Sequence, residues 1–210
     1  MKNQSLTNQV FSDGAEKYAE KFMNFDAYHH SFDQFLELIQ TDAPKILDAA
    51  CGPGNIAKYL LTKKPKIKLT GIDLAPKMIE LARVHNPNGN FELKNLLEFD
   101  GVYDAIICGF GLPYLTKEEA IQFIQKAASS LSKDGVLYIS TMEDEYEKSS
   151  LQAPSSGEGS SLFIHYHEAE YLKETMHSAG FEISFEAREE YEHTKEMTFT
   201  DLILIGRKIT

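Results

Sequence analysis

The chain has 210 residues but only two cysteines, no tryptophan and no run of eighteen apolar residues. Neither Cys51 nor Cys108 has a histidine or a second cysteine at the spacing of a metal site, so we expect no metal and two packed thiols in a reducing compartment. Without a long apolar run, no membrane span is expected. The opening residues, MKNQSLTNQV, lack the apolar stretch of a signal peptide, and a cytoplasmic location is therefore expected.

Positive charge is also scarce. Lysine and arginine number 21 against 32 aspartates and glutamates, which gives a formal net charge of −11. Such a surface repels the phosphates of nucleic acids and of anionic lipids. The densest group of lysines, within residues 63–68, flanks an expected strand and is typical of solvated loop charge. We therefore expect a small-molecule partner rather than a nucleic acid or a membrane.

One segment, residues 45–60, is more informative than the rest of the chain. It reads KILDAACGPGNIAKYL, which is a short apolar strand ending in Asp48, a loop of small residues, and the start of a helical pattern. Strand, glycine turn and helix is the arrangement by which α/β proteins bring backbone N–H groups close to a nucleotide-like ligand. Gly52 and Gly54 leave room for that approach and allow positive φ angles.

The identity of this ligand depends on Asp48. Residues 52–57 fit a relaxed dinucleotide fingerprint, and Asp73 follows Gly54 by 73 − 54 = 19 residues, near the spacing of a ribose-binding acid. A carboxylate on the lip of the loop, however, would repel a pyrophosphate and suit a cation. S-adenosylmethionine has no phosphate and carries a sulfonium and an ammonium group. Alternatively, Asp48 has no contact with a ligand and only caps the turn.

Two segments resemble a known family. ILDAACGPG resembles the first motif of class I S-adenosylmethionine-dependent methyltransferases, and GIDLAPKMIELAR, residues 71–83, resembles the segment that follows it. The resemblance extends from about Tyr18 to Arg207. It implies transfer of a methyl group from S-adenosylmethionine to a small-molecule acceptor by in-line displacement, with S-adenosylhomocysteine as product. It indicates the cofactor and leaves the acceptor open.

Two other functions stay open from the sequence. The chain could be a methyltransferase-like protein that binds the cofactor without catalysis, as a sensor, or an NAD(P)-dependent oxidoreductase that tolerates Asp48. A monomer and a homodimer are equally compatible with the sequence.

The order of the apolar patterns predicts one α/β domain over residues 1–210. We expect a doubly wound, mostly parallel seven-stranded Rossmann-like sheet with an antiparallel C-terminal hairpin. Two N-terminal helices within residues 1–42 should cap a cofactor-binding core at 45–141. Residues 142–166 are polar and rich in serine and glycine, which predicts a mobile loop or lid. A helix and the strand pair follow at 167–210.

The resemblance also implies the cofactor-binding residues. The acid Asp48 would meet the ammonium and Asp73 both ribose hydroxyls, while Leu74 and Met78 would sandwich the adenine. Asn95 stands where the family usually has an acid, and Ala75 where a capping residue is common. The full expected set is Tyr18, Asp48, Ala50, Gly52, Gly54, Asp73, Leu74, Met78, Asn95, Leu96, Gly109 and Phe110.

The sequence assigns no catalytic residue. A base is needed only if the acceptor must lose a proton, and histidine is the natural side chain for that task. The weak candidates are His29, His30, His165 and Tyr166. Residues 111–114, GLPY, resemble the Asn/Asp-Pro-Pro-Tyr motif of amide and base methylating enzymes, but the polar first residue is missing and we reject that interpretation.

Overall fold

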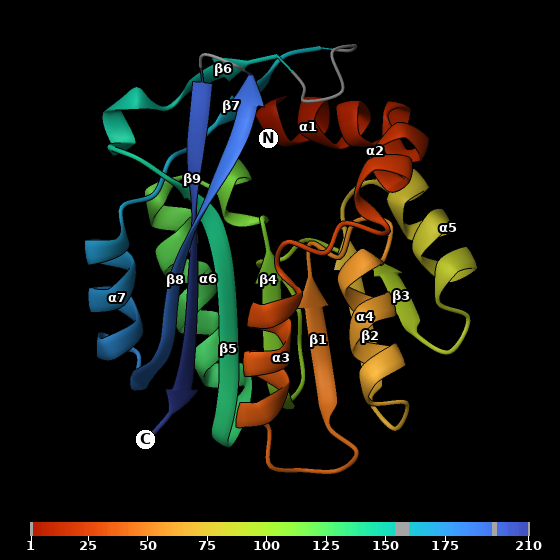
Figure 1. Ribbon diagram of the computed structural model, residues 1–210, viewed down its shortest axis with the longest axis vertical. Coiled ribbons are helices and arrows are strands. Elements are labelled where there is room, and N and C mark those ends of the chain that lie inside the picture. The colour runs from red at the N-terminus through yellow and green to blue at the C-terminus, as the bar shows by residue number, and fades with distance from the viewer. Residues whose placement is uncertain (1, 154–159, 195–196, 210) are drawn as a thin grey trace.

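A computed structural model of the chain describes residues 2–153, 160–194 and 197–209. Its main sheet has seven strands in the order β3-β2-β1-β4-β5-β9-β8. These strands are β1 (Lys45–Ala49), β2 (Lys68–Asp73), β3 (Asn90–Leu93), β4 (Tyr103–Gly109), β5 (Leu131–Glu143), β8 (Phe181–Thr194) and β9 (Met197–Lys208). β1 to β5 are parallel, whereas β9 runs antiparallel to both β5 and β8. The predicted fold class is confirmed (Figure 1).

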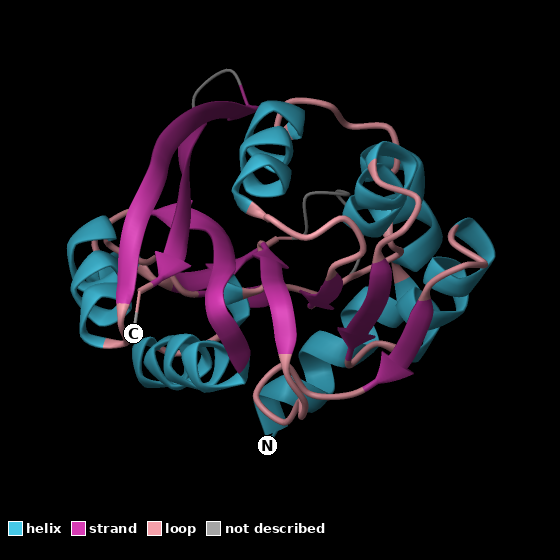
Figure 2. Cartoon of the chain, turned by 90° about the horizontal axis from the view of Figure 1, so that it is seen from below, coloured by secondary structure: helices cyan, strands magenta, loops and turns pink. Residues whose placement is uncertain are grey.

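Helices cover both faces of this sheet (Figure 2). They are α1 (Lys2–Asp13), α2 (Ala15–Phe22), α3 (His29–Leu38), α4 (Asn55–Lys63), α5 (Pro76–His85), α6 (Lys117–Ser130) and α7 (Ala169–Ser178). Successive residues of a strand point to opposite faces of the sheet and pack in different hydrophobic clusters. Ile106 packs in the cluster beneath α6 and α7, and Ile107 packs in the cluster beneath α3, α4 and α5. This alternation is why the central strands read as continuous apolar runs.

The N-terminal region contains three helices, where the sequence predicted two. The first predicted helix is divided at Gly14 into α1 and α2, and Gly14 has no side chain that could cap α2. Both helices lie across the C-terminal ends of the central strands (Figure 1), and both contact α5. The apolar face predicted for residues 32–39 is buried on α3 and the segment after it.

Residues 142–166 hold more structure than a loop. β5 continues to Glu143, a short 3-10 helix spans Tyr146–Lys148, and β6 (Ser150–Gln152) pairs antiparallel with β7 (Leu162–Ile164). Residues 154–159, within the predicted lid, lie outside the described residues. The predicted mobility of this segment stays a prediction.

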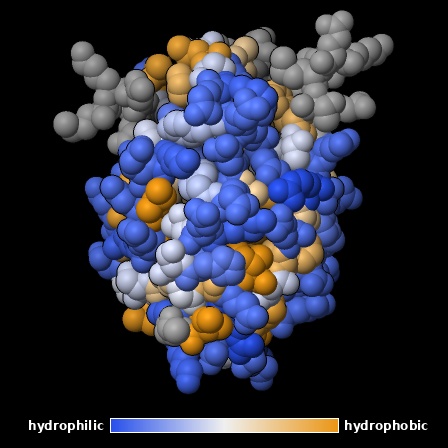
Figure 3. Space-filling model, turned by 90° about the vertical axis from the view of Figure 1, so that its left-hand side faces the viewer, coloured by the Kyte–Doolittle hydropathy of each residue, from blue (hydrophilic) through white to orange (hydrophobic). Residues whose placement is uncertain are grey.

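The face that carries α7 is mostly hydrophilic, with scattered apolar residues (Figure 3). No helix in the described part of the chain combines the length and the apolar character needed to cross a bilayer.

Candidate functional site

A cavity of about 500 Å³ lies at the C-terminal ends of the parallel strands, where the order of strands reverses between β1 and β4. Ligands collect at such switch points in doubly wound sheets. Two walls enclose it. The sheet wall comes from the strand ends and their loops: Ala50, Gly52, Asp73, Leu74, Met78, Lys94, Asn95, Leu96, Gly109, Phe110 and Gly111. The cover wall comes from α1 and the β6–β7 segment: Leu6, Thr7, Asn8, Phe11, Leu151, Ser161, Leu162, Phe163 and His165. Tyr18, Tyr114, Leu115, Thr116 and Glu119 lie between these walls.

The loop after β1 owes its shape to left-handed backbone conformations. The φ angles are +60° at Ala50, +52° at Gly52 and +82° at Gly54. Gly54 has no room for a side chain, because an added Cβ would lie 2.4 Å from Nδ2 of Asn86. The same amide of Asn86 donates to the Gly54 carbonyl over 2.9 Å and so ties the loop to α5. Gly54 therefore shapes the loop without lining the cavity.

Asp73, at the end of β2, places its carboxylate in the sheet wall. One oxygen accepts from the Gly52 amide at 2.9 Å, and the other accepts from the Ala75 amide at 2.8 Å. Burial raises the pKa of Asp73, and the amides of Ala75, Gly52 and Leu74 oppose that rise. Each carboxylate oxygen keeps lone pairs for a further donor. Ala75 is the N-cap residue of α5 and makes no side-chain cap hydrogen bond.

Asp48 lies beneath the lip of the loop rather than on it. Its side chain is 0% exposed, it does not line the cavity, and neither carboxylate oxygen has a hydrogen-bond partner among the described residues. Burial, reinforced by the charge of Asp73, raises the pKa of Asp48 to about 8. The expectation of an exposed carboxylate at this position is thus wrong in its geometry, and direct contact with a ligand ammonium stays a prediction.

The remaining expected cofactor residues gather at the sheet wall. Leu74, Met78, Asn95 and Leu96 line one part of it, and Oδ1 of Asn95 accepts from the Leu97 amide at 2.9 Å. The side-chain carbonyl of Asn95 therefore already holds its own loop, although an sp² oxygen can accept a second bond.

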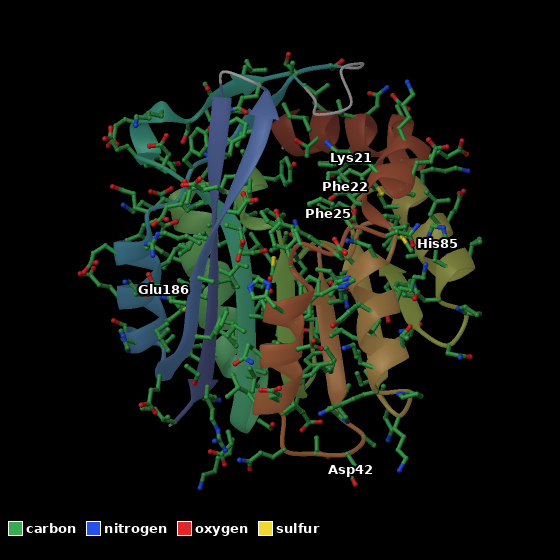
Figure 4. All side chains as sticks on the ribbon, in the orientation of Figure 1. Lys21, Phe22, Phe25, Asp42, His85 and Glu186 are labelled. Atoms are coloured by element: carbon green, nitrogen blue, oxygen red, sulfur yellow. The ribbon has the colours of Figure 1, made fainter. Side chains whose placement is uncertain are left out.

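Gly109 and Phe110 line the cavity from the end of β4. Phe110 has a φ of +57°, and its amide lies 3.1 Å from Oγ of Ser140. A row of aromatic side chains leads from there to the N-terminal helices through Tyr28, Phe25 and Phe22, with ring centroids 5.1, 5.5 and 5.9 Å apart. Figure 4 shows Phe22 and Phe25 near the strand ends.

Two tyrosines present phenol groups in the cavity. Tyr18 comes from α2, and Tyr114 from the 3-10 helix Leu112–Tyr114. Neither hydroxyl makes a hydrogen bond to a described residue, so both can serve a ligand. Burial raises the pKa of Tyr18 to about 12 and raises that of Tyr114 above its ordinary range, so both are neutral donors at pH 7. The sequence suggested Tyr18, but rejecting the GLPY motif left Tyr114 unassigned.

Of the four candidate bases, His165 lines the cavity. Its Nδ1 lies 3.3 Å from the Tyr146 hydroxyl, its Nε2 has no hydrogen bond to a described residue, and burial lowers its pKa. It is therefore neutral at pH 7 and able to accept a proton.

The other three candidates lie outside the cavity lining. The ring of His29 lies 4.1 Å from that of Tyr59, and Nε2 of His30 lies 3.2 Å from Glu189. The Tyr166 hydroxyl accepts from Gln152 at 2.7 Å. No described group of three or more histidine, cysteine or acidic side chains has the geometry of a metal site.

Most of the cover wall was absent from the sequence-based set. Leu6, Phe11, Leu151 and Phe163 belong to segments that are about 140 residues apart in the chain, and α1 contacts β7 only because the fold brings them together. Thr116 and Glu119 form the capping box of α6: the Glu119 amide donates to Oγ1 of Thr116 at 3.3 Å, and Oε2 of Glu119 accepts from the Thr116 amide at 2.9 Å. Nothing in their sequence pattern indicates that both residues line a cavity.

Comparisons with known proteins agree with this geometry. Residues 46–135 match the family model described as "Methyltransferase domain". The chain is 33% identical over 109 residues to a demethylmenaquinone methyltransferase of Thermotoga maritima, covering 49% of this chain and 48% of that protein. It is 31% identical over 135 residues to a malonyl-[acyl-carrier protein] O-methyltransferase of Acetivibrio thermocellus, covering 59% and 47%. The chain thus spans about half the length of the curated relatives that it matches.

Solved structures share the fold over nearly the whole chain. The 1,6-didemethyltoxoflavin-N1-methyltransferase of Burkholderia thailandensis superposes with a TM-score of 0.74 at 18% identity, covering 99% of this chain and 89% of that one. The magnesium protoporphyrin IX methyltransferase of Synechocystis gives 0.73 at 17% identity, covering 98% and 97%. Together with the two sequence motifs, these findings show that the chain has the class I methyltransferase fold and that residues 46–135 match the methyltransferase-domain family.

Proposed function

We propose that this chain binds S-adenosylmethionine in the cavity and transfers its methyl group to a small-molecule acceptor. The observation that carries the proposal is the carboxylate of Asp73, fixed by the Gly52 and Ala75 amides in the wall of the cavity. A carboxylate with lone pairs on both oxygens suits the vicinal diol of a ribose. Adjacent apolar side chains, Leu74 and Met78, suit an adenine ring.

The charges around the cavity favour this cofactor over a dinucleotide. Lys94 is the single lysine or arginine among the described lining residues, and its Nζ lies 4.0 Å from Glu92 and 3.9 Å from Asp100. A pyrophosphate would therefore meet Asp73 without a free cation to offset the repulsion. Asp48 is buried just below the loop with no hydrogen-bond partner among the described residues, and a nearby cation would favour its ionised form. A ligand with an ammonium and a sulfonium group fits these acidic surroundings.

When bound, S-adenosylmethionine supplies a methyl group on a sulfonium sulfur, which becomes a neutral thioether as the methyl leaves. The chain's own residues would hold and align the reactants. Asp73 would bind the ribose, and Gly52 would let the backbone approach the methionine part. Tyr18 would donate to its carboxylate. The cover wall would exclude water, so that the acceptor is held in line with the methyl group.

The names of the relatives indicate a range of acceptors, from demethylmenaquinone to a malonyl group on acyl-carrier protein. These acceptors differ in size, charge and the atom that is methylated, so the relatives support a methyl transfer without selecting its acceptor. We propose the acceptor class below, from the cavity itself.

Isothermal titration calorimetry with S-adenosylhomocysteine tests the proposal. We expect saturable binding, at least tenfold weakened by Asp73→Asn and unchanged by Asp100→Asn, which alters a carboxyl that is 86% exposed. Binding of NADH in place of S-adenosylhomocysteine would refute the proposal. Release of S-adenosylhomocysteine from S-adenosylmethionine, assayed against a metabolite panel, would exclude a protein that only binds the cofactor.

A further inference from the structure

The lining of the cavity also includes the aromatic and aliphatic side chains of Phe11, Tyr114, Leu151 and Phe163. The ring of Phe11 packs edge-on against Tyr114, with centroids 5.0 Å apart at 88°, and against Tyr18 at 6.1 Å. In the β6–β7 segment of the cover wall, the ring centroids of Phe163 and His165 lie 4.8 Å apart. Aromatic side chains at such angles bind flat rings through offset and edge contacts.

This wall keeps apolar surface exposed to the solvent. Leu6, Leu151 and Phe163 are 45%, 66% and 40% exposed, although each lines the cavity. Exposed apolar side chains that gather at one cavity mark a surface that binds an apolar ligand.

The charges near the cover wall disfavour an anionic ligand. Thr116 and Glu119 place the N-terminus of α6 at the cavity, where a helix would favour an anion. The acidic residues Glu118 and Glu119 already occupy that first turn, and Glu119 is held by its bond from the Thr116 amide. Lys94, the single lysine or arginine in the described lining, lies near two carboxylates.

Two polar groups of the described lining, one on Tyr114 and one on His165, are uncharged and have no described partner. The Tyr114 hydroxyl is a neutral donor, and Nε2 of His165 makes no hydrogen bond to a described residue. The His165 amide donates to the carbonyl of Pro113, the residue before Tyr114, at 2.8 Å, so the two residues are neighbours in the fold. One of these groups can donate to the oxygen of a ligand hydroxyl, and the other can accept its proton.

We propose that the methyl acceptor is an uncharged aromatic molecule that carries a hydroxyl group, bound between Phe11, Tyr114 and Phe163. This inference rests on the proposed cofactor and extends it to the second substrate. Tyr114 orients the hydroxyl and His165 takes its proton. The hydroxyl oxygen donates an electron pair to the methyl carbon, the carbon–sulfur pair stays on sulfur, and the proton of the broken O–H bond moves to His165.

A matched pair of ring compounds tests the acceptor class. Protein saturated with S-adenosylhomocysteine is titrated with 2-naphthol and with 6-hydroxy-2-naphthoate, which differ by one carboxylate, and with trans-aconitate as a tricarboxylate. We expect 2-naphthol to bind at least tenfold more tightly than 6-hydroxy-2-naphthoate and trans-aconitate not to bind. Tritium transfer from labelled S-adenosylmethionine should follow the same order.

Two substitutions test the location. Phe163→Leu should weaken 2-naphthol binding several-fold and leave S-adenosylhomocysteine binding unchanged, whereas Phe185→Leu, the same change on β8, should alter neither. Leu151→Lys should improve binding of 6-hydroxy-2-naphthoate at least threefold, because it adds a cation to the cover wall. Val102→Lys is the control, since Val102 is 60% exposed and lies outside the cavity.

The outcomes separate this inference from the cofactor proposal. If S-adenosylhomocysteine binds but the carboxylated ring binds as tightly as 2-naphthol, or neither ring binds, the acceptor class is wrong and the cofactor proposal stands. If S-adenosylhomocysteine does not bind at all, the proposed function fails and the acceptor class fails with it.

Discussion

The sheet wall and the cover wall enclose the same cavity but are built in different ways. The sheet wall is fixed by backbone: Asp73 accepts two amide bonds, and Gly52 and Ala50 adopt left-handed conformations between a strand and a helix. The cover wall is formed by side chains of α1 and the β6–β7 segment, which meet through tertiary contacts and remain partly exposed. A wall fixed by backbone hydrogen bonds suits a cofactor common to a whole family, whereas a wall of side chains on separate segments can change with the acceptor.

The largest effect should come from crowding the loop after β1, which shapes the sheet wall. Gly54→Ala should lower the free energy of unfolding by about 2–5 kcal/mol, because it adds a Cβ that would lie 2.4 Å from Asn86 at a positive φ. Urea denaturation measures the loss. The control is Gly52→Ala, also at a positive φ but with its nearest contact at 3.9 Å, which should lose only about 1–2 kcal/mol. Equal losses would show that crowding is unimportant.

Next in size is the loss of the Asp73 charge. Asp73→Asn should weaken S-adenosylhomocysteine binding about 10- to 100-fold, or about 1.4–2.8 kcal/mol, because a neutral amide offers one acceptor oxygen where the carboxylate offers two. Calorimetry on the folded variant measures it. Unchanged affinity would show that the ribose does not lie at Asp73.

Asp48 should give the sheet wall a pH-dependent stability. Its pKa is about 8 in the fold and near 3.9 in the unfolded chain, so between these values the folded carboxyl holds a proton that the unfolded one lacks. The free energy of unfolding therefore falls as the pH rises toward 8, by up to about 1.4 kcal/mol per pH unit.

The window for this measurement is pH 6.5 to 8. Below pH 6.5, His167 makes the free energy of unfolding rise with pH. Burial lowers its pKa to about 4, so the folded histidine stays neutral where the unfolded one binds a proton. Urea midpoints should fall with rising pH in the unmodified chain and stay nearly level in Asp48→Asn. The same slope in both proteins would assign the titration to another group.

The smallest effect on stability should come from the exposed side chains of the cover wall. Leu151→Ala should change the free energy of unfolding by less than about 0.5 kcal/mol, since the side chain is 66% exposed. Its neighbour in the same small sheet, Leu162, is 6% exposed, and Leu162→Ala should cost about 2 kcal/mol or more. A large loss at Leu151 would mean that the cover wall is as rigid as the sheet wall.

The difference between the walls also explains what the sequence could predict. Local patterns gave the sheet wall: apolar strands ending at Asp48 and Asp73, and glycines at 52 and 54. They also placed Pro76 in the first turn of α5, as the structure confirms. These features depend on neighbours within a few residues.

Three features depended on distant contacts and were missed. Gly14 divides α1 from α2, although an isolated glycine can also lie inside a helix. Leu6 and Phe163 meet at the cavity only after the chain has folded. The depth of Asp48 depends on the packing around the loop, whereas its position in the sequence showed only that it ends a strand.

The placement of α1 has a practical consequence for handling the protein. Because Leu6 and Phe11 form part of the cavity, any residues fused ahead of them emerge beside the opening through which small molecules pass. The opposite terminus leaves the sheet at the far end of the molecule, below the edge strands (Figure 1). A purification tag or a surface-attachment group therefore belongs after Lys208, and ligand-binding constants measured with a tag at the other terminus would include the tag's own competition for the opening.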